Sequence, residues 1–202
     1  MTNAMAETKI AEEDQLRADL YDFLAALLAR PADEGLLKQC AALSGDDSDL
    51  GQAIGALSRV ARAVKPRAVE SEFNALFIGL GRGELLPYAS FYLTGFLNEK
   101  PLATLRSDMS AQRITRAENV YEPEDNIASL MEMMAGLITG RFGEPASLEA
   151  QKTFYNKHIG PWAAHFYSDL EGAKNSVLYA AVGAVGKAFM EIEREAFRMI
   201  AE

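Results

Sequence analysis

Apolar side chains recur at intervals of three and four residues along most of this chain, and that spacing constrains its fold more than any other feature. Residues 16–28 place their large apolar side chains on one helix face, and Pro31 ends the run. The same spacing returns in residues 127–138 and again in residues 178–200. We find no convincing strand, so the sequence predicts an all-α fold, a single globular domain of about nine to eleven helices.

Three prolines mark predicted helix starts, because a proline at the first helical position loses no hydrogen bond. Pro66 is predicted to open a helix that reaches Phe77, and Pro101 a helix that ends near residue 112. Pro123 is predicted to occupy the first position of the next helix. Within residues 85–97, aromatic side chains recur at offsets of three, four and eight, which is typical of a buried helix face.

The length of 202 residues suits one domain. Residues 1–9 show no apolar periodicity, so we expect a flexible N-terminus followed by a single helical domain over residues 10–202. Residues 113–121 form a connector that could act as a hinge.

Charge and cysteine content exclude several functions. The chain carries 20 Lys and Arg against 29 Asp and Glu, a net charge of -9, which argues against binding to nucleic acid. This balance suits a basic partner, although simple solubility is the favoured explanation. The single cysteine, Cys40, allows no internal disulfide and is expected to be a buried thiol. No membrane span, signal peptide or twin-arginine pair is visible, so we expect a cytoplasmic protein.

The sequence lacks recognisable catalytic machinery. A di-iron helical bundle needs Glu three residues before each histidine, but Tyr155 and Trp162 precede His158 and His165. The glycines at 79, 81 and 83 permit an abrupt turn and match no dinucleotide or phosphate-loop pattern. We therefore expect no enzyme activity, no metal and no cofactor, with the two histidines serving in packing or on the surface.

Three motifs of the middle region, taken together with a fourth near the C-terminus, carry a family resemblance. They are Phe73-x-x-Leu76-Phe77, Pro87-Tyr88-x-Ser90-x-Tyr92, Glu122-Pro123-x-Asp125 and His158-x-x-Pro161-Trp162. In order and separation they resemble the TorD/DmsD family of redox-enzyme maturation chaperones over residues 15–198. Asn126 stands where the family motif usually has histidine, and asparagine cannot titrate near neutral pH.

The resemblance implies an all-helical cytoplasmic chaperone that binds the twin-arginine signal peptide of a molybdenum-cofactor oxidoreductase. Such a chaperone holds the apoenzyme until cofactor insertion and so delays export. Clients of the dimethyl sulfoxide, trimethylamine oxide and formate dehydrogenase types fit equally, as do a monomer and a domain-swapped dimer. The implied signal-peptide-binding residues are Phe73, Leu76, Phe77, Tyr88, Glu122, Pro123, Asp125 and Asn126.

A physical interpretation supports this resemblance but leaves alternatives open. Glu122 or Asp125 could accept paired hydrogen bonds from a leader arginine, and aromatic and Met side chains could line a groove for its apolar middle. The same residues could instead serve only as core and as a helix start. The alternative functions are a nucleotide (GTP)-binding or hydrolysing protein and a helical adaptor without peptide preference. We expect His158 and His165 to lie outside the groove.

Overall fold

The computed structural model describes residues 10–79, 82–116, 118 and 120–200, so the prediction for residues 1–9 lies outside them. The described residues form ten α-helices and two π-helices, and they contain no strand, which confirms the predicted fold class. In chain order the helices are α1 (Glu12–Ala29), α2 (Glu34–Ala42), α3 (Asp49–Ala63), α4 (Pro66–Phe73), η1 (Asn74–Ile78), α5 (Ala89–Thr94), α6 (Lys100–Ala111), α7 (Ile127–Thr139), α8 (Leu148–Phe154), η2 (Tyr155–Ile159), α9 (Ala163–Gly172) and α10 (Leu178–Met199).

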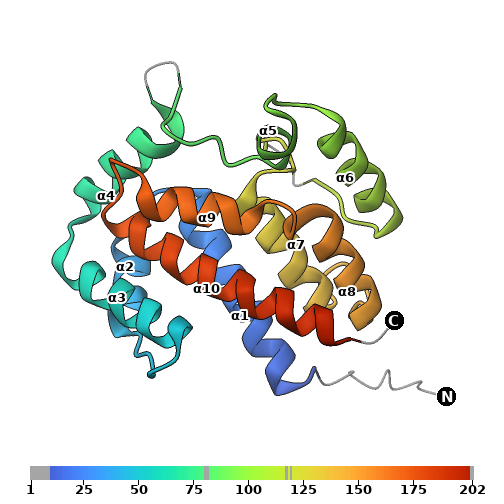
Figure 1. The fold of residues 1–202 in the computed structure, drawn as a ribbon, viewed down its shortest axis with the longest axis horizontal. Helices are drawn as coiled ribbons and strands as arrows, with labels where there is room; N and C mark the ends of the chain where they lie inside the picture. Colours follow the sequence, from blue (N-terminus) through green and yellow to red (C-terminus); the bar gives the residue numbers. More distant parts are fainter. Residues whose placement is uncertain (1–9, 80–81, 117, 119, 201–202) are drawn as a thin grey trace.

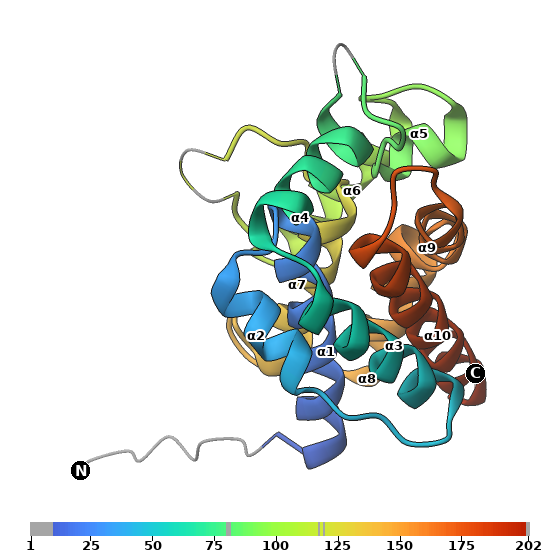
Figure 2. The same ribbon diagram turned by 90° about the vertical axis from the view of Figure 1, so that its left-hand side faces the viewer.

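The core lies where α1, α7, α9 and α10 meet. α1 packs along α7, and α10 packs on both α9 and α3 (Figure 1). Viewed from the side, α2 and α3 cover one end of this arrangement (Figure 2). In α7 ten of its thirteen residues are buried, so this helix forms the centre of the molecule.

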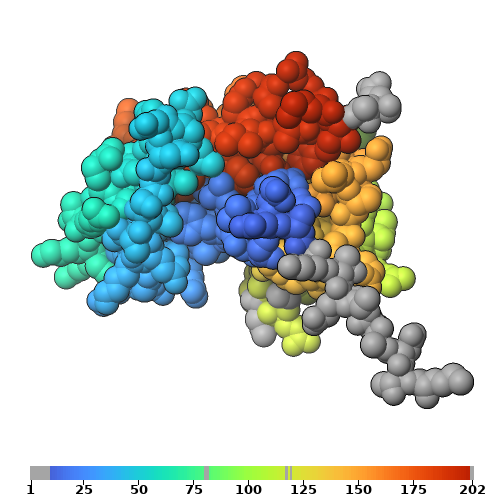
Figure 3. Space-filling view, turned by 90° about the horizontal axis from the view of Figure 1, so that it is seen from below, coloured from blue at the N-terminus to red at the C-terminus, as the bar shows by residue number. Residues whose placement is uncertain are grey.

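A buried ion pair joins α1 to α10. The guanidinium of Arg17 donates to both carboxylate oxygens of Glu193, at 2.8 and 2.9 Å, and the Tyr21 hydroxyl donates to the same carboxylate at 2.9 Å. Although burial alone lowers the pKa of Arg17, its bonds and its attraction to Glu193 raise that pKa overall. Seen from below, α1 (blue) lies beside α10 (red) (Figure 3). The pair therefore fixes how these helices lie against one another.

Glu72 of α4 holds the start of α10. Its carboxylate accepts hydrogen bonds from the backbone N–H groups of Val177, Leu178 and Tyr179, at 2.7, 3.2 and 2.8 Å. The first N–H groups of a helix have no partner within the helix, and a carboxylate there also meets the positive end of the helix dipole. Glu72 thus supplies from another helix the cap that α10 lacks locally.

Helices α5 and α6 contact each other at the upper right of Figure 1. The prediction that residues 85–97 make a buried helix face is wrong: α5 is only six residues long and Phe96 lies in the following turn, 69% exposed. α6 starts at Lys100 as its proline predicts. Non-glycine residues with positive φ precede and follow it, Asn98 at 61° and Arg113 at 58°.

The predicted start of α7 is also wrong. Pro123 lies in a turn in which its carbonyl accepts from the Asn126 N–H at 3.1 Å, and the helix begins four residues later than predicted, at Ile127. Asn126 is the residue that caps it. The proposed hinge at 113–121 includes residues outside the described part of the chain. None of the helices in the described residues is long and apolar enough to cross a membrane.

Candidate functional site

Two of the sequence motifs meet through their backbones. The Ala89 N–H donates to the carbonyl of Asp125 at 3.0 Å, and the Ile127 N–H donates to the carbonyl of Pro87 at 2.8 Å. Between them, Tyr88 and Asn126 form an isolated antiparallel bridge. Segments more than thirty residues apart in the sequence are thereby held together at the starts of α5 and α7.

Asp125 is the most constrained residue of this junction. Its side chain is 1% exposed, and its Oδ2 accepts from the Ser90 backbone N–H at 2.8 Å. Its Oδ1 is buried and has no hydrogen-bond partner among the described residues. A buried carboxylate oxygen without a partner is costly, so this atom is suited to accept a donor from a bound group.

Asp125 also lines a pocket of about 350 Å³ between α5, α6, α7 and η2. Leu93, Leu105 and Leu130 contribute apolar walls. The polar lining residues are Thr94, Lys100, Thr104, Asp125, Lys157 and His158. The volume lies at the lower end for a small-ligand site and would admit one long side chain of a peptide.

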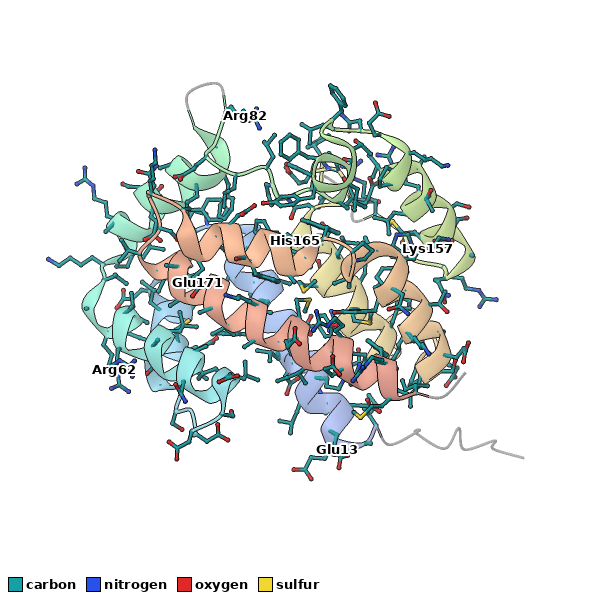
Figure 4. The ribbon with its side chains drawn as sticks, viewed as in Figure 1. Glu13, Arg62, Arg82, Lys157, His165 and Glu171 are labelled. Carbon is teal, nitrogen blue, oxygen red and sulfur yellow. The ribbon has the colours of Figure 1, made fainter. Side chains whose placement is uncertain are left out.

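A carboxylate outside the pocket lining bridges two of the lining residues. Asp108 of α6 contacts His158 Nε2 at 2.7 Å and Lys157 Nζ at 2.6 Å, both from η2. Burial lowers the pKa of His158 and outweighs the opposing effect of Asp108, so the imidazole is neutral at neutral pH. Burial raises the pKa of Asp108, but the hydrogen bonds from Lys157 and His158 hold it below its usual value. Figure 4 labels Lys157 where η2 lies beside α6.

The other two carboxylates of the motif differ in their partners. Glu124 pairs with Arg106 at 2.8 Å and with Arg116 at 3.7 Å. Burial raises the pKa of Glu124, but the bonds and charges of these arginines lower it overall. Glu122 accepts a hydrogen bond from the Tyr88 hydroxyl, and burial raises its pKa. Among the described residues Glu122 forms no ion pair, so it remains available to a basic ligand.

Asn126 has a defined structural role. Its side-chain oxygen accepts from the Ala128 N–H at 2.9 Å and caps α7, and the residue is buried. Pro123, which was predicted at the site, shapes the turn that leads to Asp125. Neither residue lines the pocket.

The first motif lies in the core. Phe73 and Leu76 are buried, and the Phe77 ring packs against Phe73 and Tyr179 at centroid distances of 4.9 and 5.8 Å. None of the three motif residues lines the pocket. They are connected to it through the backbone, since the Leu85 N–H donates to the Leu76 carbonyl at 2.8 Å and so fixes the segment that enters α5.

The structure adds two residues that the site prediction omitted. Lys157 and His158 line the same pocket as Asp125. The expectation that His158 lies outside the peptide groove stays a prediction. Their place in the His158-x-x-Pro161-Trp162 motif was the available signal. In the described part of the chain no group of His, Cys, Asp and Glu could hold a metal ion. Cys40 is buried, and burial raises its pKa to about 11.

Comparisons with known proteins agree with this architecture. A family model described as nitrate reductase delta subunit matches residues 43–168. A chaperone protein TorD of Vibrio cholerae serotype O1 is 28% identical over 210 residues, covering 94% of this chain and 94% of the relative. A TorD of Aliivibrio fischeri is 25% identical, covering 89% and 94%. A redox enzyme maturation protein from Archaeoglobus fulgidus shares the fold, with a TM-score of 0.55, 18% identity and coverage of 94% and 99%.

The curated relatives that match are named as chaperones, and the solved neighbour that shares this all-helical fold is described as a redox enzyme maturation protein. The family model covers more than half of the chain, which therefore belongs to the nitrate reductase delta subunit family, the TorD family of redox-enzyme maturation proteins.

Proposed function

We propose that this chain is a cytoplasmic chaperone that binds the twin-arginine signal peptide and the apo form of a molybdenum-cofactor oxidoreductase. It would assist cofactor insertion and delay export until assembly is complete. The observation that carries the proposal is Asp125, which lines the pocket and whose buried Oδ1 has no hydrogen-bond partner among the described residues. A guanidinium is a suitable ligand for it, because it carries several N–H donors and a permanent charge.

Asp125 supplies the specific acceptor. It is the only acidic side chain among the described residues that line the pocket. Lys157 there is paired with Asp108, and Lys100 is exposed, where water and salt weaken its repulsion of a cation. Glu122 lies three residues before Asp125 and could receive the second arginine of the pair.

The remaining motif residues would act indirectly. Phe73, Leu76 and Phe77 hold η1 against α10, and the segment after η1 leads into α5. Tyr88 binds Glu122 and so positions its carboxylate. A leader could therefore lose affinity when these residues change, even though only Asp125 and Glu122 would meet its arginines.

Nucleotide binding is the competing function. The unpartnered carboxylate in the pocket would repel a phosphate, so we expect no tight, saturable binding of GTP with Mg²⁺. Titration with labelled GTP separates the two functions.

Copurification tests the proposal in the cell. A tagged form of this protein, expressed in its own cells, should capture the apo form of a molybdoenzyme of the dimethyl sulfoxide or trimethylamine oxide reductase or formate dehydrogenase type. Removing the leader from that enzyme should reduce capture strongly. The capture of no molybdoenzyme would contradict the proposal. Sedimentation of the complex would also distinguish a monomer from a domain-swapped dimer.

A further inference from the structure

Lys157 borders two pockets, and each pocket has one carboxylate in its lining. The second, smaller pocket has a volume of about 170 Å³ and lies between α6, α8 and η2. Lys157 and His158 line both pockets, whereas Asp125 lines the larger one and Asp108 the smaller one. The two pockets therefore share the side chains of η2, and the lysine has an acidic residue on either side.

Asp108 Oδ2 binds both of the shared side chains. It lies 2.6 Å from Lys157 Nζ and 2.7 Å from His158 Nε2. Although burial raises the pKa of Asp108, these bonds keep it below its usual value, so the carboxylate is charged at neutral pH. A charged carboxylate only accepts hydrogen bonds, so both nitrogens donate to it. The ammonium of Lys157 is therefore held by the carboxylate of the smaller pocket.

Without this bond, Asp125 would be the competing partner for Lys157. Its Oδ1 is buried without a hydrogen-bond partner among the described residues, and the residue lines the same pocket as Lys157. The Lys157 side chain is 46% exposed, and a lysine on its flexible stem can change partner by rotation. An ammonium bound to Asp125 would occupy the acceptor that the proposed function assigns to a leader arginine.

We propose that Asp108 is a positioning residue, which keeps the Lys157 ammonium away from Asp125 and so leaves Asp125 available to a guanidinium. The inference rests on the proposed function and adds to it a residue that lies outside all four sequence motifs. Asp108 lines the smaller pocket and, in this role, does not touch the ligand itself. Its influence on binding is therefore expected to depend entirely on the presence of Lys157.

A double-substitution cycle tests this dependence. Asp108→Asn should weaken binding of a fluorescently labelled twin-arginine leader roughly fivefold, which corresponds to about 1 kcal/mol for a partly exposed ion pair. In a Lys157→Met background, the same substitution should change the affinity less than about twofold, because no ammonium is left to redirect. By contrast, the mere loss of one negative charge near the ligand would weaken binding equally in both backgrounds.

Two further variants separate positioning from folding. Asp108→Glu keeps a carboxylate on α6 and should retain most of the affinity that Asp108→Asn loses. Glu171→Gln is the matched control, because it removes a carboxylate from a partly exposed pair with Lys187 and should leave the affinity unchanged. Figure 4 labels Glu171 and Lys157 and shows them well apart. Thermal melting of each variant checks that the protein is folded.

The outcomes distinguish this inference from the proposed function. Equal losses on Asp108→Asn in the two backgrounds, or no loss in either, would overturn the inference and leave the proposed function intact. Lys157→Met alone should bind the leader at least as tightly as the wild type, and weaker binding would also overturn the inference. That measurement does not require Asp108→Asn to fold. Failure of the wild type to bind any leader would instead overturn the proposed function.

Discussion

The backbone N–H of Ser90 donates a 2.8 Å hydrogen bond to Asp125 Oδ2, which joins the first turn of α5 to the segment before α7. One oxygen of the carboxylate is used in this structural bond, and the other is buried without a partner among the described residues; the residue as a whole lines the pocket. Asp125 is therefore oriented by the fold, and the proposed function assigns its second oxygen to a ligand. This division separates its contribution to stability from its contribution to binding.

Asp125→Asn should weaken leader binding without unfolding the protein. The amide oxygen can still accept from Ser90, whereas the charge that attracts an arginine is lost, at a cost of about 1.5–3 kcal/mol in binding. Calorimetry measures this loss, and thermal melting checks the fold. Glu124→Gln is the control, because Glu124 is already paired with Arg106 and should leave affinity nearly unchanged. Equal losses in both variants would argue against a specific role for Asp125.

Asn126→Ala should destabilise the protein by about 1 kcal/mol, because α7 loses its N-cap hydrogen bond to Ala128. Asn126→Asp retains an acceptor at this position and should recover much of the stability. Urea denaturation measures both changes. A stable Asn126→Ala variant with impaired leader binding would move this residue from a structural role to a binding role.

His158 should make stability depend on pH. Burial holds its pKa below the ordinary value of 6.5 in the folded protein, so the unfolded chain takes up the proton first. Stability is therefore complete above about pH 6.5 and is lost as the pH falls through the folded-state pKa. The charged groups around His158 are Asp108 and Lys157, with Lys100 and Asp125 elsewhere in the pocket. The pKa of Asp108 is also lowered, so the contribution of Asp108 to stability is lost only at more acidic pH.

Melting temperatures measured from pH 7.5 to pH 5 test this expectation. His158→Gln should show a smaller loss than the wild type, and the exposed His165→Gln should behave like the wild type. Because His158 stays neutral at the upper end of the range, leader affinity should vary less than about threefold between pH 6.5 and pH 8, under 1 kcal/mol. A His158→Gln variant with the wild-type pH profile would be the contrary result.

Breaking the Arg17–Glu193 pair should be strongly destabilising. Arg17→Met leaves the Glu193 carboxylate, which is 1% exposed, with the Tyr21 hydroxyl as its one remaining side-chain partner among the described residues. Removing one partner of a buried pair costs about 3–5 kcal/mol. Arg198→Met is the control, because the Arg198 side chain is 76% exposed in its pair with Glu195 and should change stability little. Equal denaturation midpoints for the two variants would show that the buried pair is dispensable.

Local sequence rules predicted the long helices well. The repeat of apolar positions identified α1, α7 and α10, and Pro66 and Pro101 marked the starts of α4 and α6. These features depend on a residue and its neighbours within a few turns. The predicted start of α7 at Pro123 was wrong because proline suits a turn as readily as a first helical position. The turn forms here because the tertiary bridge between Tyr88 and Asn126 precedes the helix.

The composition of the pocket was only partly predictable. Asp125 was identified from its motif, but its pairing with Ser90 depends on the tertiary contact between α5 and the segment before α7. His158 joins the pocket because Asp108 ties α6 to η2, a contact between residues fifty positions apart. The exposure of Phe96 was missed for a similar reason: helical spacing indicates a shared face but not whether another element covers it.

The central claim is recognition of a leader peptide by its arginines, and calorimetry with two peptides tests it most directly. A twin-arginine leader from a molybdoenzyme of the same cells should bind the folded protein saturably, and the affinity should fall as salt concentration rises. The same leader with both arginines replaced by glutamine should bind at least about tenfold more weakly, a loss of about 1.4 kcal/mol or more. Equal affinity for the two peptides, or no binding of either by folded protein, would contradict the account.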